Sequence, residues 1–191
     1  MSLTGELTTR ELVAFGLGCL LTLACFNNGV AQARMVPSGS MAPTLSSGDR
    51  ILIKPEKPTL DQVARGDVLI FKPPFGSVPG EEDTGGWLAE FLRVSEDQTY
   101  VKRVVGLPGD EVRVQKGVGV FVNGLMIDED YTLERPQYDW GPQRVPEGKL
   151  FMLGDNRNNS FDSHYWGFLP VGNVVGRPVA VIWPHHRWKG F

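Results

Sequence analysis

The chain begins with one long apolar segment and then changes to short apolar runs separated by turns. Residues 12–26 read LVAFGLGCLLTLACF, fifteen residues without a charge. As a helix this segment spans about 22 Å, and continuing it to Ala31 brings it to about 30 Å, the thickness of the hydrocarbon core of a bilayer. The pattern therefore predicts a transmembrane anchor over residues 12–31, preceded by a short tail of residues 1–11.

The same segment has a second interpretation, as the hydrophobic part of a signal peptide that is removed. Ala31-Gln32-Ala33 follows it and has the small-x-small pattern of a cleavage site. Arg10 on one flank and Arg34 on the other leave the orientation in the membrane undetermined by charge. The anchor is favoured because the chemically interesting residues follow so closely.

Beyond residue 34 the pattern is that of short strands. Runs rich in Val, Ile and Leu alternate with Gly and Pro, of which the chain has 23 and 14, and this spacing is typical of antiparallel all-β domains. Asn123-Gly124 predicts a tight hairpin, and Leu107-Pro108-Gly109-Asp110 a type II turn. We expect a β domain over residues 34–183 and a basic, aromatic tail over residues 184–191. The expected strands are Ile51–Ile53, Val68–Phe71, Tyr100–Val105, Val112–Gln115, Val118–Val122, Leu125–Ile127, Leu150–Leu153 and Val174–Trp183.

One stretch interrupts this pattern. Residues 72–86 are rich in Pro, Gly and acidic residues, and Trp87–Leu92 then has the apolar spacing of a short amphipathic helix. Such a helix could cover the β core, or it could contact the membrane or the substrate approach. The sequence leaves both interpretations open.

Composition excludes several classes of site. The formal net charge is −3, from 19 basic and 22 acidic residues, which removes the electrostatic case for nucleic-acid binding. Both cysteines, Cys19 and Cys25, lie inside the apolar segment. The β domain therefore has neither a disulfide framework nor a cysteine metal site, and no H-E-x-x-H motif occurs.

Three polar blocks contain the candidate chemistry. They are PSGSMAPTL at 37–45, YVKRVVGLPGD at 100–110 and GDNRNNSFDS at 154–163. A serine hydroxyl needs a base to act as a nucleophile. A lysine can be that base if its pKa falls by about three units, which costs the ammonium form about 4 kcal/mol and is usually achieved by burial. Lys102 fits, because it lies among valines in a predicted strand where period-2 alternation can point it inward.

A histidine base is the alternative. His164 and Asp162 could belong to a Ser-His-Asp triad, although they are two residues apart in a turn-like run and no nucleophile elbow is present. His185 and His186 lie in the tail, where an exposed position is expected.

Taken together and in this order, the three blocks resemble type I signal peptidases, which are membrane-anchored serine proteases with a Ser/Lys dyad. The resemblance implies a mostly β, antiparallel domain of the signal-peptidase/LexA type. It also implies that Ser40 is the nucleophile and Lys102 its general base. The oxyanion hole would consist of the Ser40 backbone N–H and the Ser38 hydroxyl, and Ser160 would hydrogen-bond the lysine amine and orient it.

The resemblance also assigns structural charges. It implies that Asp155 pairs with Arg103, and that Arg157 and Asp162 support the same block. The chain departs from the common bacterial pattern at Asn158, where Asp is frequent, and at His164, where an Arg often pairs with Asp162. The resulting NNSFDSH variant is similar to cyanobacterial and thylakoidal members, and the short spacing between the second and third blocks indicates a compact form.

From the same resemblance we expect a substrate that lies extended along the edges 36–38 and 100–102, and cleavage after small-x-small sequences such as Ala-x-Ala. No metal or cofactor is implied. The expected partners are signal peptides of exported preproteins and the lipid bilayer, with no nucleic acid and a monomeric enzyme. The expected location is the plasma or thylakoid membrane, crossed once, with the catalytic domain on the extracytoplasmic or lumenal side. The pocket for small side chains would be lined by Val36, Met41, Leu45, Ile51, Tyr100 and Val101.

Two rival functions and one self-reaction remain open at this stage. The chain could be a self-cleaving regulator of the LexA kind, although a DNA-binding domain is missing, or an inactive anchored module that only binds signal peptides. The Ala31-Gln32-Ala33 pattern also predicts slow self-cleavage after Ala33, between two molecules, unless these alanines merely end the helix.

Overall fold

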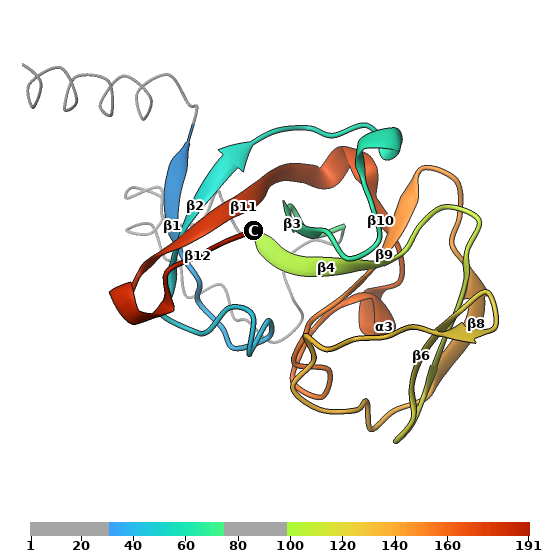
Figure 1. Cartoon of the computed structure of the whole chain (residues 1–191). Coiled ribbons are helices and arrows are strands. Elements are labelled where there is room, and N and C mark those ends of the chain that lie inside the picture. The colour runs from blue at the N-terminus through green and yellow to red at the C-terminus, as the bar shows by residue number, and fades with distance from the viewer. Residues whose placement is uncertain (1–30, 75–98) are drawn as a thin grey trace, which may run out of the picture.

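The computed structural model describes residues 31–74 and 99–191, which form two antiparallel β-sheets (Figure 1). The larger sheet has the strand order β1-β2-β11-β3-β4-β9-β10, with β12 paired to β11, and the smaller has the order β7-β6-β5-β8. The expected mostly β, antiparallel fold is confirmed. The strands of the larger sheet are β1 Gln32–Met35, β2 Arg50–Pro55, β3 Val68–Phe71, β4 Tyr100–Gly106, β9 Lys149–Leu153, β10 Leu169–Pro170, β11 Val174–Trp183 and β12 Lys189–Gly190.

The smaller sheet and the helices are short. Its strands are β5 Glu111–Gln115, β6 Gly119–Val122, β7 Leu125–Met126 and β8 Trp140–Arg144. The helical pieces in the described residues are η1 Leu60–Gln62, α3 Ser163–Trp166, η2 Val171–Asn173 and η3 His185–Arg187.

The two sheets meet at the end of β4. At Gly106 a Cβ atom would lie 2.7 Å from a methyl group of Val112 and 2.9 Å from one of Val145, so only glycine allows this close approach. The predicted type II turn follows, with the Asp110 N–H donating to the Leu107 carbonyl over 3.0 Å and with Gly109 at a φ of 84°. β5 thereby starts the second sheet beside the first.

The hairpin between β6 and β7 forms where the sequence predicts it. Asn123 has a φ of 52° and Gly124 a φ of 80°, as a type I′ turn requires of its two central residues.

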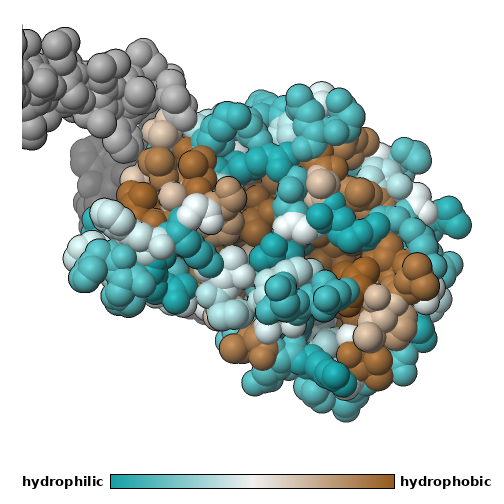
Figure 2. All heavy atoms as spheres, in the orientation of Figure 1, coloured by the Kyte–Doolittle hydropathy of each residue, from teal (hydrophilic) through white to brown (hydrophobic). Residues whose placement is uncertain are grey.

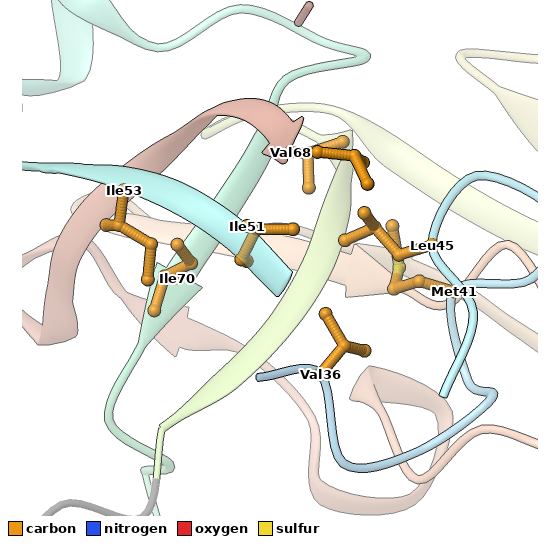
Figure 3. Close-up of a cluster of buried hydrophobic side chains, with 8 residues drawn as sticks. Val36, Met41, Leu45, Ile51, Ile53, Val68 and Ile70 are labelled. Atoms are coloured by element: carbon orange, nitrogen blue, oxygen red, sulfur yellow. The ribbon is translucent and has the colours of Figure 1, made fainter. Parts of the chain in front are cut away.

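Alternation along the strands divides the core of the larger sheet into two faces. In β3, Val68 and Ile70 join one cluster, whereas Leu69 and Phe71 join another. This is the period of two that places successive side chains on opposite faces of a sheet. The first cluster packs beneath the loop that contains Ser40 (Figure 3) and comprises Val36, Met41, Leu45, Ile51, Ile53, Val68, Ile70 and Val181.

A third cluster joins the two sheets. Phe151 and Leu153 of β9 pack with the inward residues of β5 and β6. The ring centroid of Phe151 lies 4.3 Å from that of Trp140 in β8. The block that begins at Gly154 therefore starts from a strand that is packed against both sheets.

The predicted membrane anchor and the predicted helix over Trp87–Leu92 lie outside the described residues, except for Ala31 at the end of the anchor. In the ranges 31–74 and 99–191, no helix has the length and apolar character needed to span a membrane.

Candidate active site

The three sequence blocks converge at one end of the larger sheet. Ser40 lies in the tight loop after β1, and Lys102 lies in β4, opposite Leu69 of β3. The Lys102 Nζ donates to the Ser40 Oγ over 2.9 Å and to the Val101 carbonyl over 3.1 Å. Both side chains are buried, with 3% of Lys102 and 7% of Ser40 exposed. Residues 62 positions apart in the sequence are thus in direct contact.

Burial changes the acid–base properties of this lysine. Loss of hydration lowers the pKa of Lys102 from 10.5 to about 8, although the negative charges of Asp162 and Asp155 act in the opposite direction. A pKa of about 8 leaves roughly a tenth of the amine neutral at pH 7, and only the neutral amine can accept a proton. The site therefore holds a serine hydroxyl and a lysine amine of lowered pKa in hydrogen-bond contact.

Ser38 stands beside the same hydroxyl. Its Oγ donates to the Ser40 Oγ over 3.2 Å, which places a second hydroxyl at the mouth of the site. The expected oxyanion donors, the Ser38 hydroxyl and the Ser40 backbone N–H, therefore belong to residues two positions apart in the same loop.

The third block holds the nucleophile loop by its backbone. The Asn156 N–H donates to the Ser40 carbonyl over 3.1 Å, and the Asn156 Nδ2 donates to the Gly39 carbonyl over 3.2 Å. A Cβ at Gly154 would lie 2.4 Å from the Ser40 carbonyl oxygen and 2.2 Å from the Ser160 Oγ. This glycine is therefore required for the two loops to touch. The sequence analysis did not identify Gly154 or Asn156 as site residues.

Ser160 lies in this contact region, but its hydroxyl has no hydrogen-bond partner within the described part of the chain. The side chain is 7% exposed. The expected hydrogen bond between Ser160 and the Lys102 amine is therefore absent, and the amine donates to the Ser40 Oγ and the Val101 carbonyl.

Arg103 and Asp155 form the ion pair that the resemblance implies. The guanidinium is bidentate, with Nε–Oδ1 and Nη2–Oδ2 distances of 2.8 and 2.7 Å. It also donates to the Gly66 carbonyl over 2.7 Å and to the Thr44 Oγ1 over 3.3 Å. A planar fork suits such a bidentate contact better than an ammonium does. The pair fastens β4 to the third block and to the end of the nucleophile loop.

Arg157 has a partner that sequence reasoning missed. Its guanidinium is 1% exposed and forms a bidentate pair with Glu129, at 2.7 and 2.5 Å, while its Nε donates to the Gly154 carbonyl over 3.0 Å. Glu129 belongs to the connection between β7 and β8. Nothing in the local sequence marks it, because the two residues are 28 positions apart and lie in two separate connections between elements.

The same connection supplies Tyr131. Its ring lies 3.9 Å from the Arg103 guanidinium carbon, and its hydroxyl donates to the Glu129 Oε1 over 2.8 Å. Burial raises the pKa of the Tyr131 hydroxyl, which keeps it a neutral donor. The connection between β7 and β8 therefore contacts the two buried arginines of the site, Arg103 through Tyr131 and Arg157 through Glu129.

Asp162 and His164 are in contact beside this block. The Asp162 Oδ2 accepts from the Gly154 N–H over 2.9 Å, and its Oδ1 lies 2.6 Å from the His164 Nδ1. The imidazole stacks on Tyr138, with ring centroids 4.1 Å apart. His164 thus occupies the position beside Asp162 where the common pattern has an arginine. Asn158, the other departure, binds the β7–β8 connection through its side chain, to Gln137 N–H and to Glu134.

The expected substrate pocket is divided between two clusters. Val36, Met41, Leu45 and Ile51 pack together in the first cluster, and Val101 lies against it (Figure 3). Tyr100 lies against the second cluster and stacks on Phe71, with centroids 6.3 Å apart. The reason is strand alternation, which sends residues 100 and 101 to opposite faces of β4. Within the described ranges, no group of three His, Cys, Asp or Glu side chains could hold a metal ion.

Comparisons with known proteins identify the family of the chain. Residues 9–183 match the family described as signal peptidase, peptidase S26. A probable signal peptidase I-2 of Synechocystis is 42% identical over 159 residues, which are 83% of this chain and 66% of that protein. A signal peptidase I of Leptolyngbya laminosa is 39% identical over 90% of this chain and 78% of its own length.

Two further comparisons extend the range of relatives. Thylakoidal processing peptidase 1 of Arabidopsis thaliana is 40% identical over 83% of this chain and 44% of its own length. A crystal structure of a signal peptidase I from Enterococcus faecalis is 29% identical and covers 60% of this chain and 95% of its own, with a TM-score of 0.44. The family match spans most of the sequence, and it includes all three blocks. The chain therefore belongs to the type I signal peptidases, a family of serine endopeptidases.

Proposed function

We propose that this chain removes N-terminal signal peptides from exported preproteins with a Ser40/Lys102 dyad, and that it cuts after small-x-small sequences. The observation that carries the proposal is the buried 2.9 Å contact between the Lys102 Nζ and the Ser40 Oγ. A lysine that is both desolvated and hydrogen-bonded to a serine hydroxyl has the two properties of a general base.

In the first half of the reaction, the Ser40 Oγ attacks the carbonyl carbon of the scissile bond while the Lys102 Nζ takes its proton. The negative charge that develops on the carbonyl oxygen is stabilised by the Ser40 backbone N–H and the Ser38 hydroxyl. When the C–N bond breaks, the proton passes from Lys102 to the leaving amine. The preprotein departs with a new N-terminus, and the signal peptide stays bound to Ser40 as an ester.

In the second half, a water attacks the ester carbonyl and Lys102 accepts one of its protons. The same proton then returns to the Ser40 Oγ as the ester C–O bond breaks. We propose that Ser160, whose buried hydroxyl has no partner in the described residues, receives the lysine amine during this cycle and so orients it.

The selectivity for small residues is proposed from the packing beside the dyad. Val36, Met41, Leu45 and Ile51 are each at most 3% exposed, so they present little free surface to a substrate. Side chains larger than those of alanine or similar residues would have to displace this packed cluster.

The location is proposed from the relatives. They include bacterial signal peptidases and a chloroplast thylakoidal processing peptidase. We place the chain as a monomer at the plasma or thylakoid membrane, crossing it once, with the β domain on the extracytoplasmic or lumenal side, where exported preproteins emerge.

A preprotein-processing assay tests the proposal. We expect Ser40→Ala and Lys102→Met each to abolish cleavage, and His164→Ala to retain it. Loss of cleavage in His164→Ala together with cleavage by Lys102→Met would favour a histidine base instead. A chain that binds preproteins but leaves them uncut would be the inactive binder, and one that cuts only itself would be a self-cleaving regulator.

A further inference from the structure

One peptide unit of the nucleophile loop is held by a side chain from the third block. The Asn156 Nδ2 donates to the Gly39 carbonyl over 3.2 Å, and the Asn156 N–H donates to the Ser40 carbonyl over 3.1 Å. The amide faces the loop with its NH2 group, because a carbonyl oxygen can only accept. A single residue, 117 positions after Gly39, therefore binds two successive carbonyls of the loop.

The peptide bond between Gly39 and Ser40 links this contact to the reaction. Its carbonyl belongs to Gly39, and its N–H belongs to Ser40 and is one of the two donors proposed to stabilise the oxyanion. The bond is trans, so its C=O and its N–H point in opposite directions within one plane. A donor that fixes the direction of the carbonyl therefore fixes the direction of the N–H. Among residues 31–74 and 99–191 the Ser40 N–H has no acceptor, so it is available to a substrate.

Hydrogen bonds to the Gly39 carbonyl are what hold this peptide plane. The Ala42 N–H donates to the same oxygen over 3.0 Å, so both of its lone pairs are used. A Cβ at Gly39 would meet no described atom within 4 Å beyond its chain neighbours, so close packing at this position does not restrain the peptide. The loop supplies one of the two donors, and Asn156 supplies the other.

Asn156 is itself held in place by its neighbours. Asp155 and Arg157 are at most 1% exposed. Asp155 forms the bidentate pair with Arg103. Arg157 forms the bidentate pair with Glu129. The backbone on both sides of Asn156 is therefore fixed, as it must be for a residue that positions another group.

The surroundings of the loop make the direction of the N–H more important. Ser40 is 7% exposed, and Figure 2 shows hydrophobic surface around β1 and β2, the strands on either side of the loop. Negative charge that develops in a buried, apolar place is poorly screened by water, so each donor that points at it contributes more. A hydrogen bond to the Gly39 carbonyl also polarises the peptide, which strengthens its N–H as a donor.

We propose that Asn156 is a positioning residue for the oxyanion hole, which acts through the Gly39 carbonyl to direct the Ser40 N–H toward the substrate oxygen. The inference rests on the proposed function, since it needs Ser40 as the nucleophile and its N–H as an oxyanion donor.

Replacement of Asn156 tests this role. Asn156→Ala and Asn156→Leu both remove the side-chain donor and keep the backbone N–H, and leucine also keeps about the same side-chain volume. With the full chain in detergent and a peptide that contains a small-x-small sequence, we expect kcat to fall roughly 10- to 30-fold and KM to change less than about twofold. This loss is smaller than the roughly 10²- to 10³-fold expected for a deleted oxyanion donor, because the N–H is still present. The pH at which kcat/KM rises should not move, because Asn156 carries no charge.

A peptide boronate of the same sequence supplies a second measurement. Its tetrahedral adduct with Ser40 resembles the transition state, so its affinity should fall by the same factor as kcat. Asn158→Ala is the matched control, because Asn158 belongs to the same block but binds the β7–β8 connection instead of the nucleophile loop. Its kcat should stay within about twofold of wild type.

The outcomes separate this inference from the proposed function. Wild-type kcat in both Asn156 variants, or an equal loss in Asn158→Ala, would overturn the positioning role while cleavage itself continues. A raised KM at unchanged kcat would place the effect on substrate binding, and a shifted pH profile would place it on Lys102, so either result rejects the role. Loss of the folded state in both variants, measured by urea denaturation, would make the contact purely structural and also reject it. A wild type that cuts no peptide would overturn the proposed function.

Discussion

Two buried cations on either side of the catalytic block have opposite properties. Lys102 is 3% exposed and Arg157 is 1% exposed. The lysine contacts a hydroxyl and a carbonyl, whereas the arginine contacts a carboxylate through two hydrogen bonds. Burial lowers the pKa of Lys102 to about 8. Burial alone would also lower the pKa of Arg157, but the hydrogen bonds and the charge of Glu129 raise it above its usual value.

The difference shows that burial alone does not make a base. A carboxylate in direct contact offsets the loss of hydration and keeps a buried cation charged, as in both arginine pairs. At Lys102 the carboxylates of Asp155 and Asp162 act only at a distance, because each is engaged by other donors. The fold supplies counter-charges to the arginines, which hold the loops, and none in direct contact with the lysine.

Removing the counter-charge of Arg157 should have the largest effect on stability. Glu129→Ala leaves a buried guanidinium unpaired, and we expect the free energy of unfolding to fall by about 3–5 kcal/mol. Urea denaturation measures it. The double variant Glu129→Ala/Arg157→Met removes both charges, so it should recover much of the loss. If the double variant is as unstable as Glu129→Ala, or less stable still, the loss comes from the missing pair and not from the unpaired charge.

Replacing Lys102 should raise the free energy of unfolding rather than lower it. Lys102→Met should be inactive yet more stable than wild type near pH 7, by about 3 kcal/mol if the pKa shift is expressed fully in folding. The folded protein binds the Lys102 proton less tightly than the unfolded chain does, so wild-type stability rises as the pH passes from about 8 to 10.5. The advantage of the methionine variant should therefore fade over that range. A pH-independent difference between the two proteins would contradict this account.

The pH dependence of cleavage should report the same lysine. We expect kcat/KM to rise with pH through an apparent pKa of about 8 and then to level off. Asp162→Asn removes a negative charge that raises the pKa of Lys102, so the rise should move to lower pH. Asp61→Asn, in the exposed η1, is the matched control and should leave the profile in place. An unchanged pH profile in Asp162→Asn would show that the charge of Asp162 does not affect the pKa of Lys102.

The smallest stability effect is expected at Ser160. Its hydroxyl makes no hydrogen bond in the described structure, so Ser160→Ala breaks none and should leave the free energy of unfolding unchanged or slightly higher. Ser163→Ala, by contrast, removes the acceptor of the Met152 N–H and should cost about 1–3 kcal/mol. If Ser160 orients the lysine during turnover, its alanine variant should lose activity at nearly full stability. Full activity would reject that role.

The sequence predicted the strands that have an apolar run or a clear turn signal, and it missed those that have neither. β3 and β11 have the predicted limits because their residues are apolar and bounded by turn signals. β8 was missed because Trp140–Arg144 contains Gly and Pro and is mostly exposed, so it has no apolar alternation to detect. β1 was missed because Gln32–Met35 was interpreted as the end of the apolar segment or a cleavage motif.

The sequence likewise identified some residues of the site and missed others. Ser40, Lys102, Arg103 and Asp155 could be named from the sequence because each belongs to a recognisable local block. Glu129 could not, since its role depends on a contact between two connecting segments that no local spacing encodes. Tyr100 packs against a different cluster from the other five predicted pocket residues, because strand alternation sends residues 100 and 101 to opposite faces of β4, and its ring lies 5.6 Å from the Lys102 Nζ.

Strand β1 has a consequence for the lifetime of the enzyme. The Ala33–Arg34 bond, which has the small-x-small pattern before it, lies inside this strand with Ala33 opposite Leu52 and Arg34 opposite Ile51. A second molecule could cut there only after residues 32–35 had left β2, so the motif is protected by the same hydrogen bonds that build the fold. A cut would also divide the strand and leave Arg34 at a chain end. Self-cleavage would therefore remove only molecules whose β1 had already left β2. Such a molecule has lost the strand that leads to its own Ser40, so the cut would not reduce the number of intact enzyme molecules.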